Sequence, residues 1–133
     1  MSEENVERFV EVAEAFNRRD VRGLLGLMDS KVQFEPQQAA LQGTYVGREG
    51  VRDWLADLAA HYDFESGHVD YADIRDLGDR VLGLGTLRFI GRASRIETET
   101  VVAVVASFRD GLMTHFKDYG DKDRALEAAG LSE

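Results

Sequence analysis

The sequence of 133 residues predicts an α+β domain in which helices near the start of the chain pack on one curved, mainly antiparallel sheet. Early in the chain, apolar residues recur at steps of three and four, which is the period of an amphipathic helix. Later, long β-type stretches are separated by glycine-containing turns, which is typical of hairpins. Helices and strands that occupy separate parts of a chain indicate the α+β class. The length predicts a single domain over residues 1–133.

Three helices are expected before the main sheet. The first carries its apolar face on Val6, Phe9, Val10, Ala13 and Phe16. It ends near the pair Arg18-Arg19, which we expect to be a solvated helix end. Asp20 is suited to cap a short second helix over 21–28, because its side-chain oxygen can accept a backbone N–H. A third helix is predicted over 49–62.

The strands follow in a simple order. A short strand over 31–35 ends at Pro36, the one proline, which lacks a donor for further pairing. A loop over 37–47 separates this strand from the third helix. The later strands are expected over 64–77, 80–92, 94–109 and 112–119, with hairpin turns at Gly78-Asp79 and Asp110-Gly111. A short helix over 122–129 closes the chain, with Asp121 at its N-cap and Gly130 at its C′ position.

Two of these strands are apolar on both faces. In the strand over 80–92, Val81, Leu87 and Phe89 alternate with Leu82, Leu84 and Ile90, and the strand over 94–109 shows the same pattern. A sheet with one solvated face would alternate apolar with polar residues. Because the helices cover one face only, we expect a second copy of the chain on the other face, in a homodimer.

The composition excludes several classes of partner. The formal net charge is −9 and there is no run of Lys and Arg, so we expect neither nucleic acid nor an anionic membrane as a partner. The chain has no cysteine, which removes disulfides and thiolate metal sites. It shows no secretory signal pattern and no apolar run of the ~20 residues that a membrane span needs. The expected location is cytoplasmic, and no cofactor or metal is expected.

Several segments, taken in their order and spacing, resemble a known superfamily. They are Asn17-Arg18-Arg19-Asp20, Val32-Gln33-Phe34-Glu35-Pro36, Gly47-Arg48-Glu49-Gly50-Val51, Arg109-Asp110-Gly111, Asp118-Tyr119-Gly120-Asp121 and Ala125-Leu126-Glu127-Ala128-Ala129-Gly130-Leu131. The chain is similar to the nuclear-transport-factor-2-like superfamily and, within it, to SnoaL-like domains. This resemblance implies a cone: a bent sheet wrapped on helices around a deep apolar pocket, commonly in dimers. Relatives include ketosteroid isomerases, epoxide hydrolases and polyketide cyclases, so the fold does not assign a function.

The resemblance to ketosteroid isomerases implies an acidic base at Glu35, just before Pro36. Such a carboxylate could remove a proton next to a carbonyl if burial raised its pKa. The oxyanion donors of that chemistry, a tyrosine and a protonated aspartic acid in the known example, fall on Val12 and Ala106. Since neither residue can donate, a standard ketosteroid isomerase is not expected.

The resemblance to limonene-type epoxide hydrolases implies a catalytic aspartate at Asp118. Their further arginine and aspartate fall near Gly85 and Leu87, which cannot replace them. SnoaL-type cyclases need only an acidic base in the pocket, a role open to Asp118 or Glu35. Both are therefore our candidate catalytic residues, and we expect both side chains to point inward. The alternative is that Asp118 lies solvated or paired near the pocket mouth and that Glu35 caps a surface loop.

Strand alternation assigns faces in the last strand. Leu112, Thr114, Phe116 and Asp118 are expected to face the pocket, and Met113, His115, Lys117 and Tyr119 to face away. The candidate substrate-binding residues are Gln33, Tyr45, Trp54, Leu58, Arg88 and Phe116. Core packing is an equal alternative for the two aromatic residues Tyr45 and Trp54. For Arg88 a salt bridge at the rim is the alternative to an anionic ligand group.

The histidines do not predict a metal site. His115 is expected at a dimer interface or in a hydrogen bond, and His61 and His68 are expected to be exposed. The pair Gly83 and Gly85 does not form a dinucleotide motif, because a strand continues where a helix is required. These glycines indicate a bend or open space for a ligand.

Three functions remain open from the sequence. The first is an isomerase, cyclase or hydratase without a cofactor, acting on a hydrophobic small molecule through a buried carboxylate. The second is a module that binds an apolar ligand without chemistry. The third is a dimerising accessory subunit, which needs only the apolar outer face of the sheet.

Overall fold

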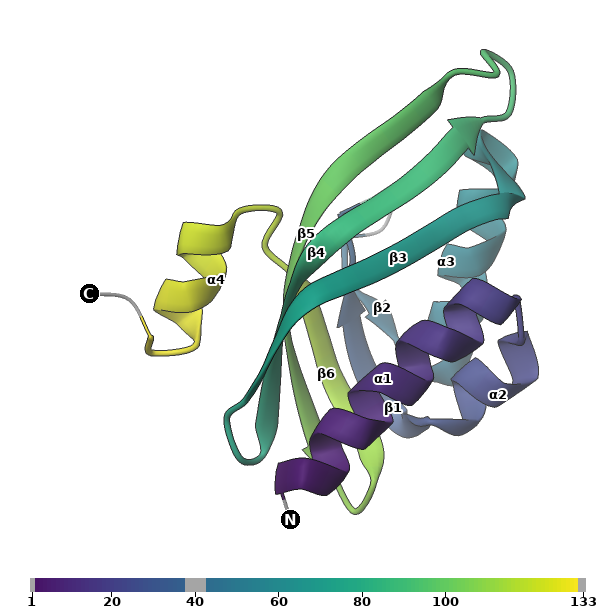
Figure 1. The fold of residues 1–133 in the computed structure, drawn as a ribbon. Helices are drawn as coiled ribbons and strands as arrows, with labels where there is room; N and C mark the ends of the chain where they lie inside the picture. Colours follow the sequence, from purple (N-terminus) through teal and green to yellow (C-terminus); the bar gives the residue numbers. More distant parts are fainter. Residues whose placement is uncertain (1, 38–42, 132–133) are drawn as a thin grey trace.

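The computed structural model describes residues 2–37 and 43–131, which form one twisted sheet with helices on both faces (Figure 1). Three helices lie on the inner face and one lies on the outer face. The inner helices are α1 (Ser2–Arg18), α2 (Val21–Gly26) and α3 (Gly47–His61), and the outer helix is α4 (Lys122–Ala128). This arrangement confirms the predicted α+β class.

The sheet has six strands in the order β2-β1-β6-β5-β4-β3. Their bounds are β1 (Met28–Glu35), β2 (Tyr45–Val46), β3 (Tyr62–Asp76), β4 (Arg80–Gly91), β5 (Glu97–Arg109) and β6 (Leu112–Asp118). All neighbouring strands pair antiparallel except β1 and β6, which pair parallel. The sheet is therefore mixed. The sequence did not predict the two-residue strand β2, and the predicted loop over 37–47 falls partly outside the described residues.

The predicted turn and cap residues take the expected conformations. Asp110 and Gly111 both have positive φ, 54° and 79°, as a two-residue hairpin turn of the primed type requires. Asp20 accepts the N–H of Gly23 at 2.9 Å and begins α2. At the end of α4, Gly130 is left-handed at φ 77°, and the N–H of Leu131 donates to the Leu126 carbonyl at 2.8 Å. This is the Schellman arrangement that satisfies the last helical carbonyls.

The glycines of β4 do not leave open space for a ligand. A Cβ added to Gly83 would lie 2.5 Å from the ring of Phe9, and one added to Gly85 would lie 1.9 Å from the backbone oxygen of Asp70. The register of β3 against β4 also shifts between Tyr71 and Asp73. The two glycines thus allow α1 and the irregular part of β3 to lie close to β4. The expectation that they leave open space for a ligand is therefore wrong, whereas the expectation of a bend agrees with the irregular register.

Helix α4 covers much of the outer face that was expected to need a second copy. Four buried residues of β4 and β5 pack with Ala125 of α4 and with Ala129 at its C-cap, and they are Leu82, Leu84, Ala103 and Val105. The chain therefore supplies its own cover for the most apolar part of this face. Val101 on β5 stays 55% exposed. The expectation of a dimer did not allow for the apolar area of the sheet that the seven-residue helix α4 covers.

Arg19 is not part of a solvated helix end, as the sequence suggested. Its backbone is left-handed at φ 63°, and its guanidinium group donates to five backbone carbonyls at the end of α1 and along β3. The carbonyls belong to Phe16, Asn17, Phe64, Glu65 and Gly67. Arg18, by contrast, is exposed. Arg19 thus fastens the corner between α1 and α2 to the sheet.

Replacement of Arg19 should test this role. We expect Arg19→Ala to lower the free energy of unfolding by about 3 kcal/mol, because it removes charge-assisted hydrogen bonds and leaves carbonyls unpaired. Arg19→Lys should recover only part of the loss, because one ammonium group cannot reproduce the planar fork. Urea denaturation measures the effect. The matched control is Arg18→Ala, which should change stability by less than about 0.5 kcal/mol; equal losses in both variants would contradict this role.

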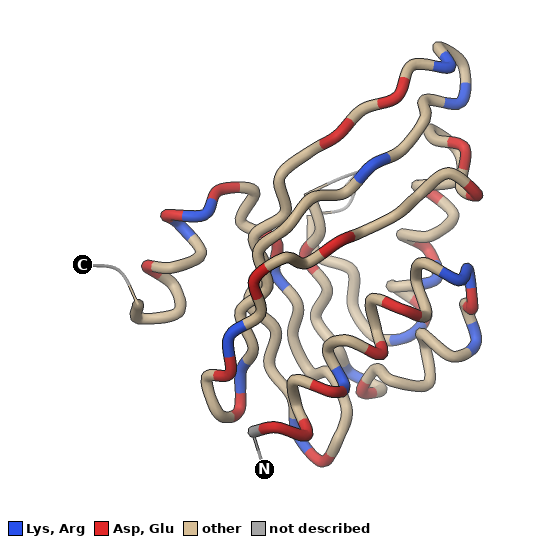
Figure 2. The backbone as a smooth tube through the Cα atoms, viewed as in Figure 1, with Lys and Arg blue, Asp and Glu red and all other residues tan. Residues whose placement is uncertain are grey.

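Positive and negative residues are interspersed along the described chain. Figure 2 shows Lys and Arg as isolated segments between Asp and Glu, without a continuous basic stretch. No helix within residues 2–37 and 43–131 is long and apolar enough to span a bilayer.

Candidate functional site

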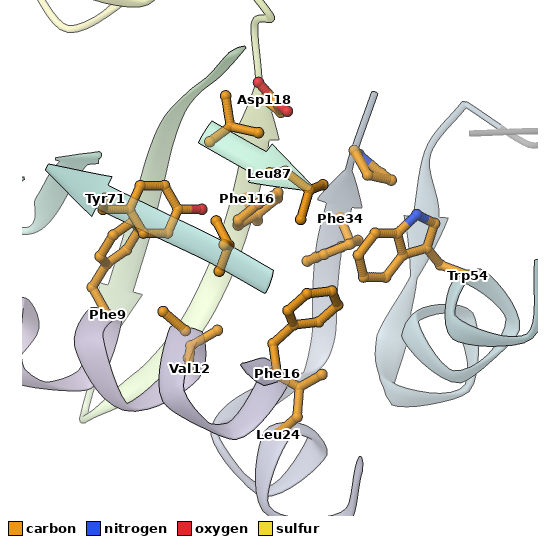
Figure 3. A pocket seen from close by; sticks show the side chains of 14 residues that line it. Phe9, Val12, Phe16, Leu24, Phe34, Trp54, Tyr71, Leu87, Phe116 and Asp118 are labelled. Atoms are coloured by element: carbon orange, nitrogen blue, oxygen red, sulfur yellow. The ribbon is translucent and has the colours of Figure 1, made fainter. Parts of the chain in front are cut away.

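A cavity of about 60 Å³ lies between the inner helices and the sheet. It is lined by fourteen described residues: Phe9, Val12, Ala13, Phe16, Leu24, Phe34, Pro36, Trp54, Val69, Tyr71, Leu87, Val102, Phe116 and Asp118. A water molecule needs about 10–15 Å³ of such volume, so the space corresponds to about four to six waters. Figure 3 shows the lining side chains converging from helices and strands.

Six of the fourteen described lining residues are aromatic. Phe34 and Phe116 are partners in the parallel register of β1 and β6, and their rings stack with centroids 4.4 Å apart. The Trp54 ring of α3 lies 4.8 Å from that of Phe34. Across the cavity, the rings of Phe9 and Tyr71 lie 4.7 Å apart. The alternation of β1 and β6 thus places two rings side by side, and the helices add the others.

Asp118 is the one ionisable carboxyl group in this lining. It is 3% exposed and lies at the end of β6, opposite Val104 of β5. Its Oδ1 accepts the N–H of Ala103 at 3.0 Å and the N–H of Gly120 at 2.9 Å. Its Oδ2 has no hydrogen-bond partner among the described residues, and no basic side chain in that part of the chain pairs with it. Burial raises the pKa of Asp118, and the two backbone N–H groups lower it by less.

Tyr71 brings a hydroxyl group to the same cavity. In Figure 3 this hydroxyl points into the group of rings, with Asp118 at one end of the group. It makes no hydrogen bond with any residue that the structure describes. Burial raises the pKa of Tyr71, and the negative charge of Asp118 raises it further. The hydroxyl therefore keeps its proton at neutral pH and is available as a donor.

Sequence reasoning missed Tyr71. The signal was the alternation of Val69 and Tyr71, which places both side chains on the inner face of β3 just before the register shift. Glycine at position 83 leaves room for this packing, because an added Cβ would lie 2.9 Å from the Tyr71 ring.

Glu35 does not point into the cavity, and this expectation was wrong. Val32 and Phe34 are buried on the inner face of β1, so the period of two directs Glu35 outward. Its Oε2 lies 2.7 Å from Nε2 of His115, and its Oε1 lies 3.8 Å from Nζ of Lys117. Glu35 and Asp118 therefore lie on opposite faces of the sheet and cannot act on one ligand.

The candidate binding residues divide into three groups. Trp54 and Phe116 line the cavity. Gln33 and Arg88 are exposed outside it, so their assignment to the pocket was wrong. Tyr45 and Leu58 are fully buried in the core and do not reach the lining, and the Tyr45 hydroxyl donates to Asp57 at 2.7 Å.

The face assignment for β6 was right for Phe116 and Asp118 and wrong for Met113. Met113 is fully buried in the inner core, because the register of β1 against β6 shifts between the Met113 pair and the His115 pair. His115 and Lys117 face away from the cavity, as expected. Val12, which the resemblance to ketosteroid isomerases placed at the tyrosine position, lies in the cavity lining.

The three histidines are dispersed. His61 and His68 are exposed, and His115 is bound to Glu35 on the outer face. Within the described ranges, no group of three or more His, Asp or Glu side chains is arranged to hold a metal ion.

A family model described as the SnoaL-like domain matches residues 6–116, which is most of the chain. The chain belongs to the SnoaL-like domain family. Solved structures of nuclear-transport-factor-2-like and ketosteroid isomerase-like proteins agree with this assignment of the fold. No curated protein matches the sequence.

Three solved structures illustrate what this SnoaL-like domain is similar to. A Burkholderia pseudomallei protein of unknown function is 23% identical, with a TM-score of 0.79 over 93% of this chain and 95% of its own. A Catenulispora acidiphila protein in complex with trimethylamine is 21% identical, with a TM-score of 0.75 over 94% and 93%. The Mycobacterium tuberculosis protein RV0760c, in complex with estradiol-17beta-hemisuccinate, is 16% identical, with a TM-score of 0.72 over 84% and 89%. At these identities the likeness shows the fold alone.

The buried carboxylate should leave a signature in stability. Because the pKa of Asp118 is raised in the folded state, the ionised group opposes folding above that pKa, and the cost disappears as pH falls toward its ordinary value of 3.8. The variant Asp118→Asn removes the charge and keeps an oxygen for the two backbone donors. We expect the stability of the variant relative to the natural chain to be greater at pH 7 than at pH 4. Urea denaturation of both proteins at the two pH values checks this, and an unchanged or reversed difference would contradict it.

Proposed function

We propose that this SnoaL-like domain binds a small, largely apolar molecule in the cavity and that Asp118 acts as a general base on it. The observation that carries the proposal is a carboxylate that is 3% exposed, has no paired cation among the described residues and lines an apolar cavity. A carboxylate with a raised pKa is a stronger base than one in water. Reactions of this kind are isomerisations, cyclisations and hydrations that begin with removal of a proton next to a carbonyl.

The two polar groups of the cavity suit two parts of one reaction. Oδ2 of Asp118 takes the proton from carbon, while Oδ1 stays fixed by the N–H groups of Ala103 and Gly120. The Tyr71 hydroxyl donates to the carbonyl oxygen as negative charge develops there. The proton then returns from Asp118 to another carbon or to oxygen. The apolar rings exclude water, which strengthens both interactions.

The cavity limits the size of the ligand. About six non-hydrogen atoms fill the space of four to six waters, so larger molecules need movement of the aromatic walls. Two proteins of similar fold were crystallised with small molecules: RV0760c with estradiol-17beta-hemisuccinate and the C. acidiphila protein with trimethylamine. Gln37 donates to the backbone oxygen of Asp118 at 2.8 Å, which places the end of β1 beside the acidic group.

Deuterium exchange tests the proposed chemistry without knowledge of the natural substrate. Cyclopentanone has six non-hydrogen atoms and exchanges the protons next to its carbonyl through an enolate. We expect the protein to accelerate this exchange above the buffer rate in D₂O, as followed by NMR. Asp118→Asn should lower the acceleration by about 100-fold or more, and Tyr71→Phe by about 10-fold. The surface variant Glu35→Gln should keep it.

Binding without exchange would favour the second candidate, a ligand-binding module. The feature that favours this candidate is that the resemblance places Val12, Ala106 and Leu87, none of which is polar, at positions where the related enzymes need polar groups. Saturable binding of small ketones with exchange at the buffer rate would support the module and remove the catalytic role of Asp118. Absence of any binding at millimolar concentration would remove both candidates.

We also propose that a second copy packs on the outer face that α4 leaves open. Val101, 55% exposed on β5, and the half-buried group of Glu35, His115 and Lys117 support this arrangement. We propose a cytoplasmic location as well, because a chain without cysteine needs no oxidising compartment to fold.

Mass determination by light scattering tests the dimer. We expect twice the chain mass of 14.9 kDa at micromolar concentration and a shift toward the single mass in Val101→Glu. The matched control is Ile96→Glu, which changes an exposed isoleucine in the turn between β4 and β5, away from this face. A single-chain mass for the natural protein would contradict the dimer.

A further inference from the structure

We infer that the cavity selects a positively charged ligand, a small protonated alkylamine, over neutral or anionic molecules of the same shape. The inference rests on the proposed function for the cavity being a ligand site. It goes further by naming the charge of the ligand, and it holds whether or not a reaction follows binding.

The charges of the lining support a cation. Among its fourteen described residues, Asp118 is the one acidic group, and none is Lys, Arg or His. Lys117, the neighbour of Asp118 in sequence, faces the opposite side, where it lies near Glu35 and 5.0 Å from the centroid of the Tyr119 ring. A buried carboxylate is costly unless a charge of opposite sign accompanies it. A cationic ligand supplies that charge, whereas an anionic ligand would meet Asp118 without any compensation.

The aromatic walls support the same choice. Six rings line the cavity, and they are Phe9, Phe16, Phe34, Trp54, Tyr71 and Phe116. The face of an aromatic ring attracts an ammonium group through its quadrupole, most strongly where water is excluded. A cavity that combines several rings with one carboxylate therefore binds an alkylammonium group through its methyl groups and its charge together. Neutral molecules of the same shape gain only the apolar contact.

The volume favours a compact head group. The space of about 60 Å³ admits about six non-hydrogen atoms without movement of the walls. A trimethylammonium or tert-butylammonium group fits within this size.

Three probes with a common tert-butyl group test the inference: tert-butylammonium, tert-butanol and pivalate. Trp54 is the one tryptophan of the chain and lines the cavity, so its indole N–H gives a single NMR signal that reports on the site. At about pH 8 we expect tert-butylammonium to bind about tenfold more tightly than tert-butanol, which has the same number of non-hydrogen atoms, and the larger pivalate, whose own carboxylate meets Asp118, to bind more weakly than both. Sodium chloride alone is the control for any effect of the counter-ion on the Trp54 signal.

Two variants distinguish the effect of the Asp118 charge in the cavity from the effect of the net charge of the protein. Asp118→Asn, with its fold checked by urea denaturation, should reduce the preference for the cation over tert-butanol to about twofold or less and leave binding of tert-butanol in place. Asp70→Asn removes an equal charge from an exposed position on β3 and should keep the tenfold preference.

The outcomes distinguish failure of the preference for a cation from failure of the proposed function. Tighter binding of tert-butanol or pivalate than of the cation, or an undiminished preference in Asp118→Asn, would overturn the inference while the proposed function stands. If none of the three probes shifts the Trp54 signal and cyclopentanone does not exchange, the cavity is not a ligand site and both fail.

Discussion

The function proposed for this protein depends on one buried carboxylate, which two backbone N–H groups hold in a largely apolar cavity. Oδ1 of Asp118 accepts two N–H groups, from Ala103 on β5 and from Gly120 in the turn that leads to α4. These bonds fix the side chain without neutralising it, because backbone donors carry only partial charge. The second oxygen is left for a ligand. Burial without a cation is thus the feature that makes this position chemically active, and also the feature that costs stability.

The fold places other elements so that this carboxylate stays buried. The parallel pairing of β1 with β6 stacks Phe34 on Phe116, and α3 adds Trp54 beside them. Helix α4 begins four residues after Asp118, with Asp121 as its cap, and packs on the opposite face of the sheet. Arg19 ties the end of α1 to β3, the strand that carries Tyr71. The inner cavity and the outer cover are therefore both connected to the end of β6.

Much of this architecture could be predicted from the sequence, because local signals and the global fold agree. The caps at Asp20 and Asp121, the turn at Asp110-Gly111 and the long strands follow from residue types whose conformational preferences are strong. The orientation of Phe116 and Asp118 also followed, because both lie beyond the irregular part of β6. Met113 lies before it, and a shift in register cannot be read from alternation alone.

The errors in the candidate site have separate physical causes. Glu35 was assigned by analogy with an acid before a proline, although buried Val32 and Phe34 set the phase of β1 and turn Glu35 outward. Tyr71 was missed because its inward position depends on a close approach to Gly83, which is a tertiary contact. Gln33 lies between buried Val32 and Phe34, and Arg88 between buried Leu87 and Phe89, so the alternation that turns Glu35 outward also turns these two residues away from the cavity.

The pKa of Asp118 tests the central claim most directly. A titration that follows the side-chain carboxyl carbon by NMR, in the ligand-free protein, measures this value for one residue. We predict a pKa above the ordinary 3.8, since burial outweighs the two backbone donors. A pKa at or below 3.8 would show a solvated or charge-paired carboxylate, and the cavity would then lack the base on which this account depends.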